Sequence, residues 1–356
     1  MTAATAPDRA WVALLRRPAL RLAAERLDVV DLVLLGLLDG RWAAFEADLR
    51  RRLRLEAVAR DRVTVAQVRA RATAFRYARG LVSAADFTAW LSERSLTLDD
   101  LSGTLARELL DDLELADVTA GPPAGARSVA DVLRVEALSR GILDALAATA
   151  VRGLAAAQRT GGLETVAADD VRVQAGLASA RASVAAPPDV FDEAAVAERL
   201  CRLAALEDAV ARVREEVAAS PAIDRRLAER GLDWLRLDGE QLSLTREGAA
   251  REARLLLTLD GVAMAEVGAR AGTSAQARTV YVEDAPRELA GAFAAAAPGE
   301  VIGPWRTDDA WHVLLLTQKT PPRADDAELR ARATDEVLDD VLAREAAGRT
   351  ERLCVL

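Results

Sequence analysis

The pattern of apolar residues changes near Gly231, and this change limits the fold more than any other feature of the chain. Before that point Ala, Leu, Arg and Glu dominate, and apolar residues recur three and four positions apart, as in amphipathic helices. After it, residues 232–238 alternate apolar and polar side chains, and residues 279–282 and 311–317 also have the composition of strands. The sequence therefore predicts a mainly α protein with one α+β domain.

Turn residues divide the chain into four segments. Gly and Pro are concentrated at 121–125, and two prolines at 321 and 322 end the part that contains the predicted strands. We expect an N-terminal helical domain (1–120), a helical continuation or connector (121–230), an α+β domain (231–322) and a C-terminal helix (323–356).

Within these segments, individual residues mark where helices begin and which of their sides are apolar. Ser83 and Thr97 each stand three positions before an acidic residue, which is typical of a helix N-terminus. The segment 63–78 has an apolar stripe made of Val65, Val68, Ala72 and Phe75. Further helices are expected over 128–158, 192–219, 222–232, 246–258, 262–271, 286–297 and 325–344, with an irregular stretch between 163 and 188.

Charge and composition exclude several classes of function. The chain has 47 Lys and Arg against 56 Asp and Glu, and its net charge of −9 makes it a poor partner for nucleic acid, whose phosphates need a basic surface. With one histidine, His312, and two distant cysteines, Cys201 and Cys354, the chain has too few ligands for a His-based zinc site. We expect no cofactor, no bound metal and two reduced thiols.

The sequence also predicts where the protein is found. Its most apolar run, residues 29–38, contains an aspartate and is about half as long as a bilayer-spanning helix, which needs about 20 residues. Residues 1–9 carry no apolar segment behind a basic one, as a secretory signal would. We therefore expect a soluble, cytoplasmic protein with no membrane span.

One ordered motif lies near the end of the predicted α+β domain. Pro298-Gly299-Glu300 is followed by Gly303-Pro304, by Thr307 and by Trp311-His312-Val313. This order resembles the C-terminal signature of parvulin-type (PpiC-type) peptidyl-prolyl isomerases, and the predicted elements before it follow that family's order. The resemblance covers residues 231–322.

The regions that flank this domain carry a second resemblance. A helical N-terminal region and one helix after the parvulin-like domain are similar to the layout of SurA-type folding factors, in which the last helix packs back on the N-terminal helical domain. The stretch 75–81, with Phe87 and Trp90 following, is similar to a PpiC-related group associated with the maturation of ribosomally made peptides.

The resemblance implies a proline-binding pocket whose floor includes a pair of histidines. His312 matches the second histidine, whereas Trp234 stands where the first is expected. Leu289 matches the large apolar residue of the pocket helix, and Phe293 follows one turn later. Ala294 falls where a second Phe is usual, and the family's Gly-rich loop is absent. These departures imply a degenerate parvulin-like domain whose isomerase activity is weak or absent.

Several of these residues have two possible roles. Tyr281, Trp305 and Trp311 are either peptide contacts or ordinary packing residues of a sheet face. His312 is either a pocket residue or a satisfied sheet histidine. Met264, on a helix with Val262 and Val267, is expected in the core.

The resemblance, with these departures from it, is compatible with three functions. The first is a peptide-binding chaperone or accessory protein in the maturation of a ribosomally made peptide, with an unfolded polypeptide, or a precursor peptide and its modifying enzymes, as partners. The second is an active peptidyl-prolyl isomerase that uses His312. The third is a non-catalytic scaffold subunit of a peptide-modifying complex.

Overall fold

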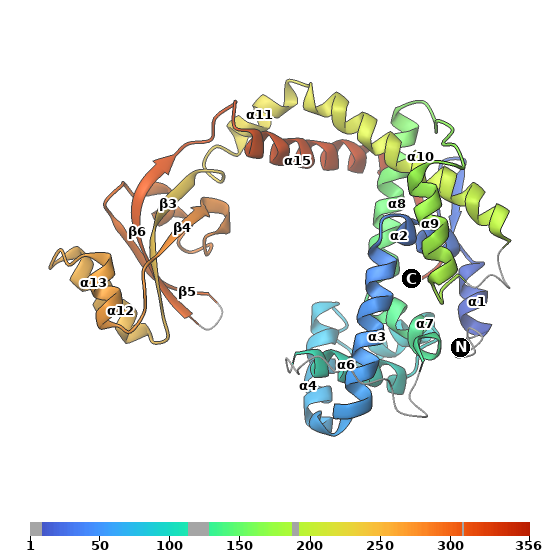
Figure 1. Cartoon of the computed structure of the whole chain (residues 1–356), viewed down its shortest axis with the longest axis horizontal. Helices are drawn as coiled ribbons and strands as arrows, with labels where there is room; N and C mark the ends of the chain where they lie inside the picture. The colour runs from blue at the N-terminus through green and yellow to red at the C-terminus, as the bar shows by residue number, and fades with distance from the viewer. Residues whose placement is uncertain (1–8, 113–127, 187–191, 308–309) are drawn as a thin grey trace. The chain divides into compact units, whose positions relative to one another are not determined.

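The computed structural model of the chain describes residues 9–112, 128–186, 192–307 and 310–356. The chain forms two compact units, one made of residues 1–213 with 341–356 and the other of residues 214–340 (Figure 1). The first unit is mainly helical and the second is an α+β unit. The predicted fold class, mainly α with one α+β domain, is confirmed.

Ten helices of the described chain lie wholly or mostly in the first unit. They are α1 (Arg9–Leu15), α2 (Val29–Leu38), α3 (Arg41–Ala59), α4 (Val65–Ala78), α5 (Ala84–Glu93), α6 (Leu98–Asp111), α7 (Val129–Ser139), α8 (Ile142–Arg159), α9 (Val171–Ala182) and α10 (Glu193–Ala218). The predicted helix starts at Ser83 and Thr97 are confirmed, because each side chain accepts a hydrogen bond from the backbone N–H three residues on.

Two expectations in this unit are wrong. The single helix expected over 128–158 is divided into α7 and α8, because Gly141 between them has a φ of +72°, which ends the helical path. The stretch expected to be irregular contains α9, which begins after the N-cap Asp170. The predicted loop at 121–125 lies outside the described residues.

A small antiparallel sheet completes the helical unit. It consists of β1 (Pro18–Leu22), β2 (Glu25–Asp28) and β7 (Thr350–Arg352), in the order β2-β1-β7. The hairpin between β1 and β2 turns through Ala23 and Ala24, with Ala23 at a φ of +53°. Hairpin turns usually use Asn or Gly at such positions, so the sequence carries no signal for these strands.

One ion pair is buried in the helical unit. Arg107 on α6 and Glu136 on α7 have side chains that are 1% and 0% exposed, and Arg107 Nε donates to Glu136 Oε1 at 2.6 Å. Arg107 Nη1 also lies 3.1 Å from Oε2 of Glu56 on α3. Arg107 therefore joins three helices at a place that water does not reach.

The α+β unit is built on a four-stranded antiparallel sheet. Its strands are β3 (Arg236–Leu244), β4 (Gln276–Tyr281), β5 (Val301–Thr307) and β6 (Ala310–Thr320), in the order β4-β3-β6-β5. The other elements are α11 (Ala222–Glu229), α12 (Glu247–Thr258), α13 (Met264–Arg270), the 3₁₀ helix η2 (Val282–Asp284), α14 (Ala290–Ala295) and α15 (Ala327–Ala346). The first strand begins four residues later than expected, because residues 231–234 form turns.

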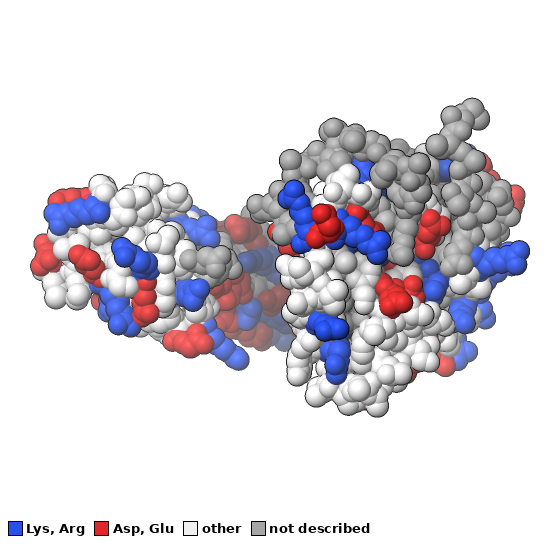
Figure 2. Space-filling model, turned by 90° about the horizontal axis from the view of Figure 1, so that it is seen from below, with Lys and Arg blue, Asp and Glu red and all other residues white. Residues whose placement is uncertain are grey.

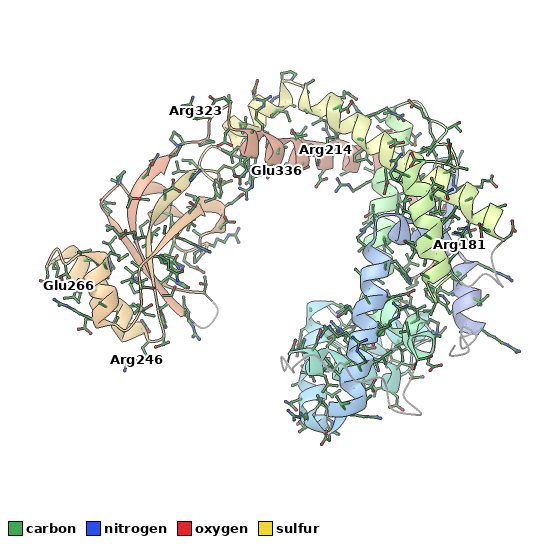
Figure 3. All side chains as sticks on the ribbon, in the orientation of Figure 1. Arg181, Arg214, Arg246, Glu266, Arg323 and Glu336 are labelled. Atoms are coloured by element: carbon green, nitrogen blue, oxygen red, sulfur yellow. The ribbon has the colours of Figure 1, made fainter. Side chains whose placement is uncertain are left out.

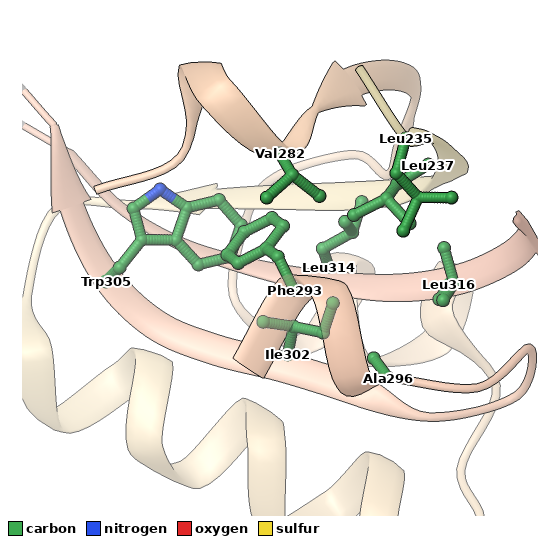
Figure 4. Close-up of a cluster of buried hydrophobic side chains, with 9 residues drawn as sticks. All are labelled: Leu235, Leu237, Val282, Phe293, Ala296, Ile302, Trp305, Leu314 and Leu316. Carbon is green, nitrogen blue, oxygen red and sulfur yellow. The ribbon is translucent and has the colours of Figure 1, made fainter. Parts of the chain in front are cut away.

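Each face of this sheet buries its own apolar cluster. On one face η2 and α14 cover a cluster made of Leu235, Leu237, Val282, Phe293, Ala296, Ile302, Trp305, Leu314 and Leu316 (Figure 4). On the other face α12 and α13 cover a cluster that contains Leu242, Leu244, Ala250, Ala253, Met264, Val267 and Val313. Successive side chains of a strand point to opposite faces, so His312 shares the first face with Leu314, and Trp311 shares the second with Val313.

Ion pairs connect the sheet to the helices that flank it in sequence. Glu283 on η2 accepts hydrogen bonds from Arg230 at 3.0 Å, Trp234 Nε1 at 3.1 Å and Arg332 at 2.5 Å. On α15, Asp335 pairs with Arg214 at the end of α10, and Glu336 pairs with Arg226 of α11 (Figure 3). These contacts hold α15 against α11 and against the last residues of α10, from Arg214 on, which belong to the α+β unit.

Charged residues of both signs are interspersed on the face shown in Figure 2. Across residues 9–112, 128–186, 192–307 and 310–356, no helix is both long and apolar enough to cross a membrane. The same described residues contain no group of three or more His, Cys, Asp or Glu that could hold a metal ion.

Candidate functional site

His312 lies on β6 at the centre of a polar group contributed by three strands. Its Nδ1 is 2.9 Å from Gln241 Nε2 and 3.1 Å from Ser243 Oγ, both on β3. Its Nε2 is 2.6 Å from Thr307 Oγ1 on β5. Because the Gln241 amide nitrogen can only donate, Nδ1 acts as the acceptor, and Nε2 then carries the proton and donates to Thr307.

Two aromatic rings continue this group into the core. The Trp305 ring centroid is 5.5 Å from that of His312, and the Phe293 ring meets Trp305 edge-on at 5.2 Å (Figure 4). Phe293, on α14, is 0% exposed, and Trp305 is 8% exposed. Leu289 packs on the same cluster and is partly buried. His312, Trp305, Phe293 and Leu289 therefore belong to one group on one face of the sheet, in which His312 and Leu289 are partly exposed, and we call it the His312 face.

A glycine sets the spacing between the two strands that carry this face. Gly303 has a φ of +115°, and a Cβ atom built on it would lie 2.7 Å from the His312 carbonyl oxygen. The pairing of β5 with β6 shifts register next to Gly303, between Ile302 and Trp305. This irregularity places Trp305 directly opposite His312.

We expect Gly303→Ala to lower the free energy of unfolding by about 2 kcal/mol or more, because alanine is strained at this φ and its methyl group meets the next strand. The matched control is Gly291→Ala, since Gly291 lies in α14 with nothing within 4 Å of its added Cβ. That change should be neutral or stabilise the protein by up to about 1 kcal/mol. Equal urea midpoints for the two variants would contradict this account.

The helix that carries Phe293 is held by the only lysine of the chain, Lys319. Lys319 Nζ, on β6, donates to the carbonyl oxygens of Ala294 and Ala296, the latter at 3.0 Å. The last carbonyls of a helix have no partners within the helix, and a cation there also interacts favourably with the helix dipole. Lys319 thus fixes the C-terminal end of α14 against the sheet.

The structure places Trp234 away from His312. Trp234 precedes β3, is 1% exposed and donates its indole N–H to Glu283. The residue directly opposite His312 on β3 is Ser243. The structure therefore does not bring Trp234 to His312, and Ser243 and Gln241 occupy the positions that face His312.

Two more predicted residues lie apart from His312. Trp311 points to the other face of the sheet and packs on the cluster under α12 and α13. Tyr281 pairs with Arg236 at the far end of β3, about 20 Å along the strand from Ser243. Its hydroxyl lies 3.4 Å from Glu328 and its ring lies under Arg332, both on α15. No single peptide-binding surface in the α+β unit includes all seven predicted residues.

Sequence reasoning missed three polar residues of the site, Gln241, Ser243 and Thr307. Thr307 belongs to the ordered motif and stands five residues before His312, so the sequence could have indicated that the two side chains lie close together. Gln241 and Ser243 lie about 70 residues from His312 in sequence, and only the strand register brings them together.

The chemistry of this group is hydrogen bonding beside an apolar surface. Its members are one imidazole, one amide and two hydroxyl groups, and none of them is a strong nucleophile. Such a group can orient a peptide amide and receive an apolar side chain, which are the requirements of a peptide-binding face or of an isomerase pocket.

Residues 239–332 match the family model described as the PPIC-type PPIASE domain. The match begins within β3 and ends within α15, so it covers the four-stranded sheet except residues 236–238, and it includes the His312 face. No curated protein matches the chain. The chain thus carries a PpiC-type domain, which suggests an isomerase-like or peptide-binding function for the α+β unit.

Proposed function

We propose that this protein is a cytoplasmic, SurA-like peptide-binding chaperone or accessory protein that acts in the maturation of a ribosomally made peptide. In this proposal the PpiC-type domain binds peptide on the His312 face and accelerates prolyl isomerisation weakly or not at all. One observation supports weak catalysis above others: His312 faces Gln241 and Ser243 where the family resemblance implies a second histidine.

A peptide-binding role needs only part of the isomerase machinery. The isomerisation barrier is roughly 18–20 kcal/mol, and lowering it requires polar groups placed around the twisted amide. Binding requires an apolar surface with a few hydrogen-bonding groups. The partly buried Leu289 side chain and the small exposed part of Trp305, on the same sheet face as His312, would supply such a surface.

An active isomerase is the second candidate. The Thr307–His312 hydrogen bond of 2.6 Å favours it, because it fixes the imidazole in one orientation next to an apolar surface. A scaffold subunit of a peptide-modifying complex is the third candidate, and it would need neither peptide affinity nor catalysis.

The test is a proline-isomerisation assay on the full chain, run beside calorimetry with a proline-containing peptide. We expect measurable binding with little or no acceleration. The gain-of-function variant Ser243→His, which restores a second histidine opposite His312, should raise the isomerisation rate. The matched control is Glu240→His, because Glu240 is an exposed residue of the same strand that points to the other face.

His312→Ala and Leu289→Ala decide between the candidates. Clear acceleration by the wild type that is lost in both variants would establish the isomerase and contradict our proposal. Peptide binding that weakens in Leu289→Ala without any acceleration would support it. If the protein shows neither binding nor acceleration, the scaffold role is the one left.

A further inference from the structure

Most side chains of helix α4 in the helical unit are exposed or only partly buried. Among the described residues it buries one side chain, Phe75. Val65, the first residue of its predicted apolar stripe, is 68% exposed, and Val68 and Ala72 are only partly buried. Three of the four stripe residues are therefore not buried, and a cavity lies along each of two sides of α4.

A groove of about 490 Å³ runs along one side of α4, between that helix and α6. Its apolar wall consists of Ala74, Ala78 and Leu105, together with the edge of Phe75. Four arginines also line it, namely Arg52, Arg71, Arg79 and Arg140, against two acids, Glu108 and Asp112. The groove is therefore positive on balance, in a chain whose net charge is −9.

Three of the four arginines already have carboxylate partners. Arg52 and Arg140 both pair with Asp48, at 2.9 and 2.8 Å, and Arg71 pairs with Asp112. Arg79 makes no ion pair with any carboxylate of the described residues. Its guanidinium lies 3.7 Å from the centre of the Phe75 ring, and one Nη donates to the carbonyl oxygen of Ser139 at 2.9 Å.

A second arginine lies on the same aromatic cluster as Arg79. Arg94 lies over the Trp90 ring at 4.5 Å, and Trp90 meets Phe75 edge-on at 5.3 Å. Arg94 pairs with Glu93 at 3.7 Å, whereas Arg79 has no such partner among the described residues. Partial desolvation lowers the pKa of Arg79, and Glu108 and Asp144 offset only part of that effect. A carboxylate bound in the groove would further stabilise the charge of Arg79.

We propose that this groove is a second binding site, distinct from the His312 face, for a peptide segment that combines acidic and apolar residues. One carboxylate of the segment would accept hydrogen bonds from Arg79, and a second would pair with Arg71, because a guanidinium matches carboxylate geometry. An adjacent apolar side chain would lie along Ala74, Ala78 and Leu105. Glu108 and Asp112 on the opposite wall disfavour a polyanion such as nucleic acid, whose closely spaced phosphates need a continuous basic surface.

The test is fluorescence anisotropy on the full chain with two short labelled peptides, one alternating leucine with aspartate and one alternating leucine with lysine. We expect the aspartate peptide to bind and the lysine peptide not to bind. Arg79→Glu should weaken binding of the aspartate peptide at least about tenfold, because it replaces a charge-assisted hydrogen bond by repulsion. Ala78→Glu, which adds a charge to an exposed wall position without removing a contact, should do the same.

Arg69→Glu is the matched control. Arg69 lies on α4 but faces the opposite side of the helix, so this change alters the net charge equally and should leave affinity unchanged. An equal loss in Arg69→Glu would show non-specific attraction and overturn the proposal. The proposal would also be overturned if the aspartate peptide did not bind, or if it bound Arg79→Glu and Ala78→Glu as tightly as the wild type. Tighter binding of a labelled oligonucleotide than of the aspartate peptide would overturn it as well. A loss in His312→Ala would assign the peptide to the other site and overturn it too.

Discussion

Replacing Arg107 by alanine is expected to lower the free energy of unfolding of the helical unit by about 3–5 kcal/mol. The change leaves Glu136, which is fully buried, with only Arg140, 4.0 Å away, to balance its charge, and it removes the link that Arg107 makes to Glu56. Taking a carboxylate out of water is costly when no partner balances it. Urea denaturation followed by circular dichroism measures the loss.

Two further variants show whether burial causes this loss. The double variant Arg107→Met with Glu136→Leu removes both charges and should recover most of the stability. Arg330→Ala breaks an ion pair with Asp224 in which both side chains are exposed, so it should cost about 1 kcal/mol or less. If Arg107→Ala lowers the free energy of unfolding no more than Arg330→Ala does, the ion pair between Arg107 and Glu136 does not hold the helices together.

Phe293→Ala should lower the stability of the α+β unit by about 3–5 kcal/mol, the usual cost of truncating a fully buried phenylalanine. The Phe293 ring supports Trp305 by an edge-on contact, and Trp305 in turn lies against His312. We therefore also expect weaker peptide binding, because the aromatic part of the His312 face loses its support.

A conservative variant at the same position separates the effect on stability from the effect on peptide binding. Phe293→Leu keeps most of the buried volume and should lose less than half as much stability. Leu255→Ala, on the exposed side of α12, should have almost no effect on either measurement. Equal losses in Phe293→Ala and Leu255→Ala would contradict the role given to the aromatic cluster.

Most helices and strands of the fold could be predicted from residues that lie close together in the sequence. Ser83 and Thr97 mark helix starts because the capping interaction involves residues three positions apart. The order of elements in the α+β domain could be predicted because strand and helix periodicities differ. The β1–β2 hairpin could not be predicted, because its turn uses Ala23 instead of a residue that favours positive φ.

The candidate site was harder to predict because it depends on strand register. His312 and Thr307 lie close in sequence, and the motif that contains both was visible. Ser243 faces His312 only because β3 starts at Arg236 and pairs with β6 in one particular register. Trp234 was placed in that position because the strand was expected to begin earlier, and a change in register alters every cross-strand pair.

The contact between Lys319 and α14 has a chemical consequence, because the chain has no other lysine. The ε-amino group of Lys319 is the one primary amine on any side chain of this protein. A reagent or enzyme that acylates lysine side chains would therefore act at the end of the helix that carries Phe293, and nowhere else among the side chains. Acylation would remove the positive charge and two of the hydrogen bonds that fix this helix. The speed of such labelling would thus report how often α14 separates from the sheet.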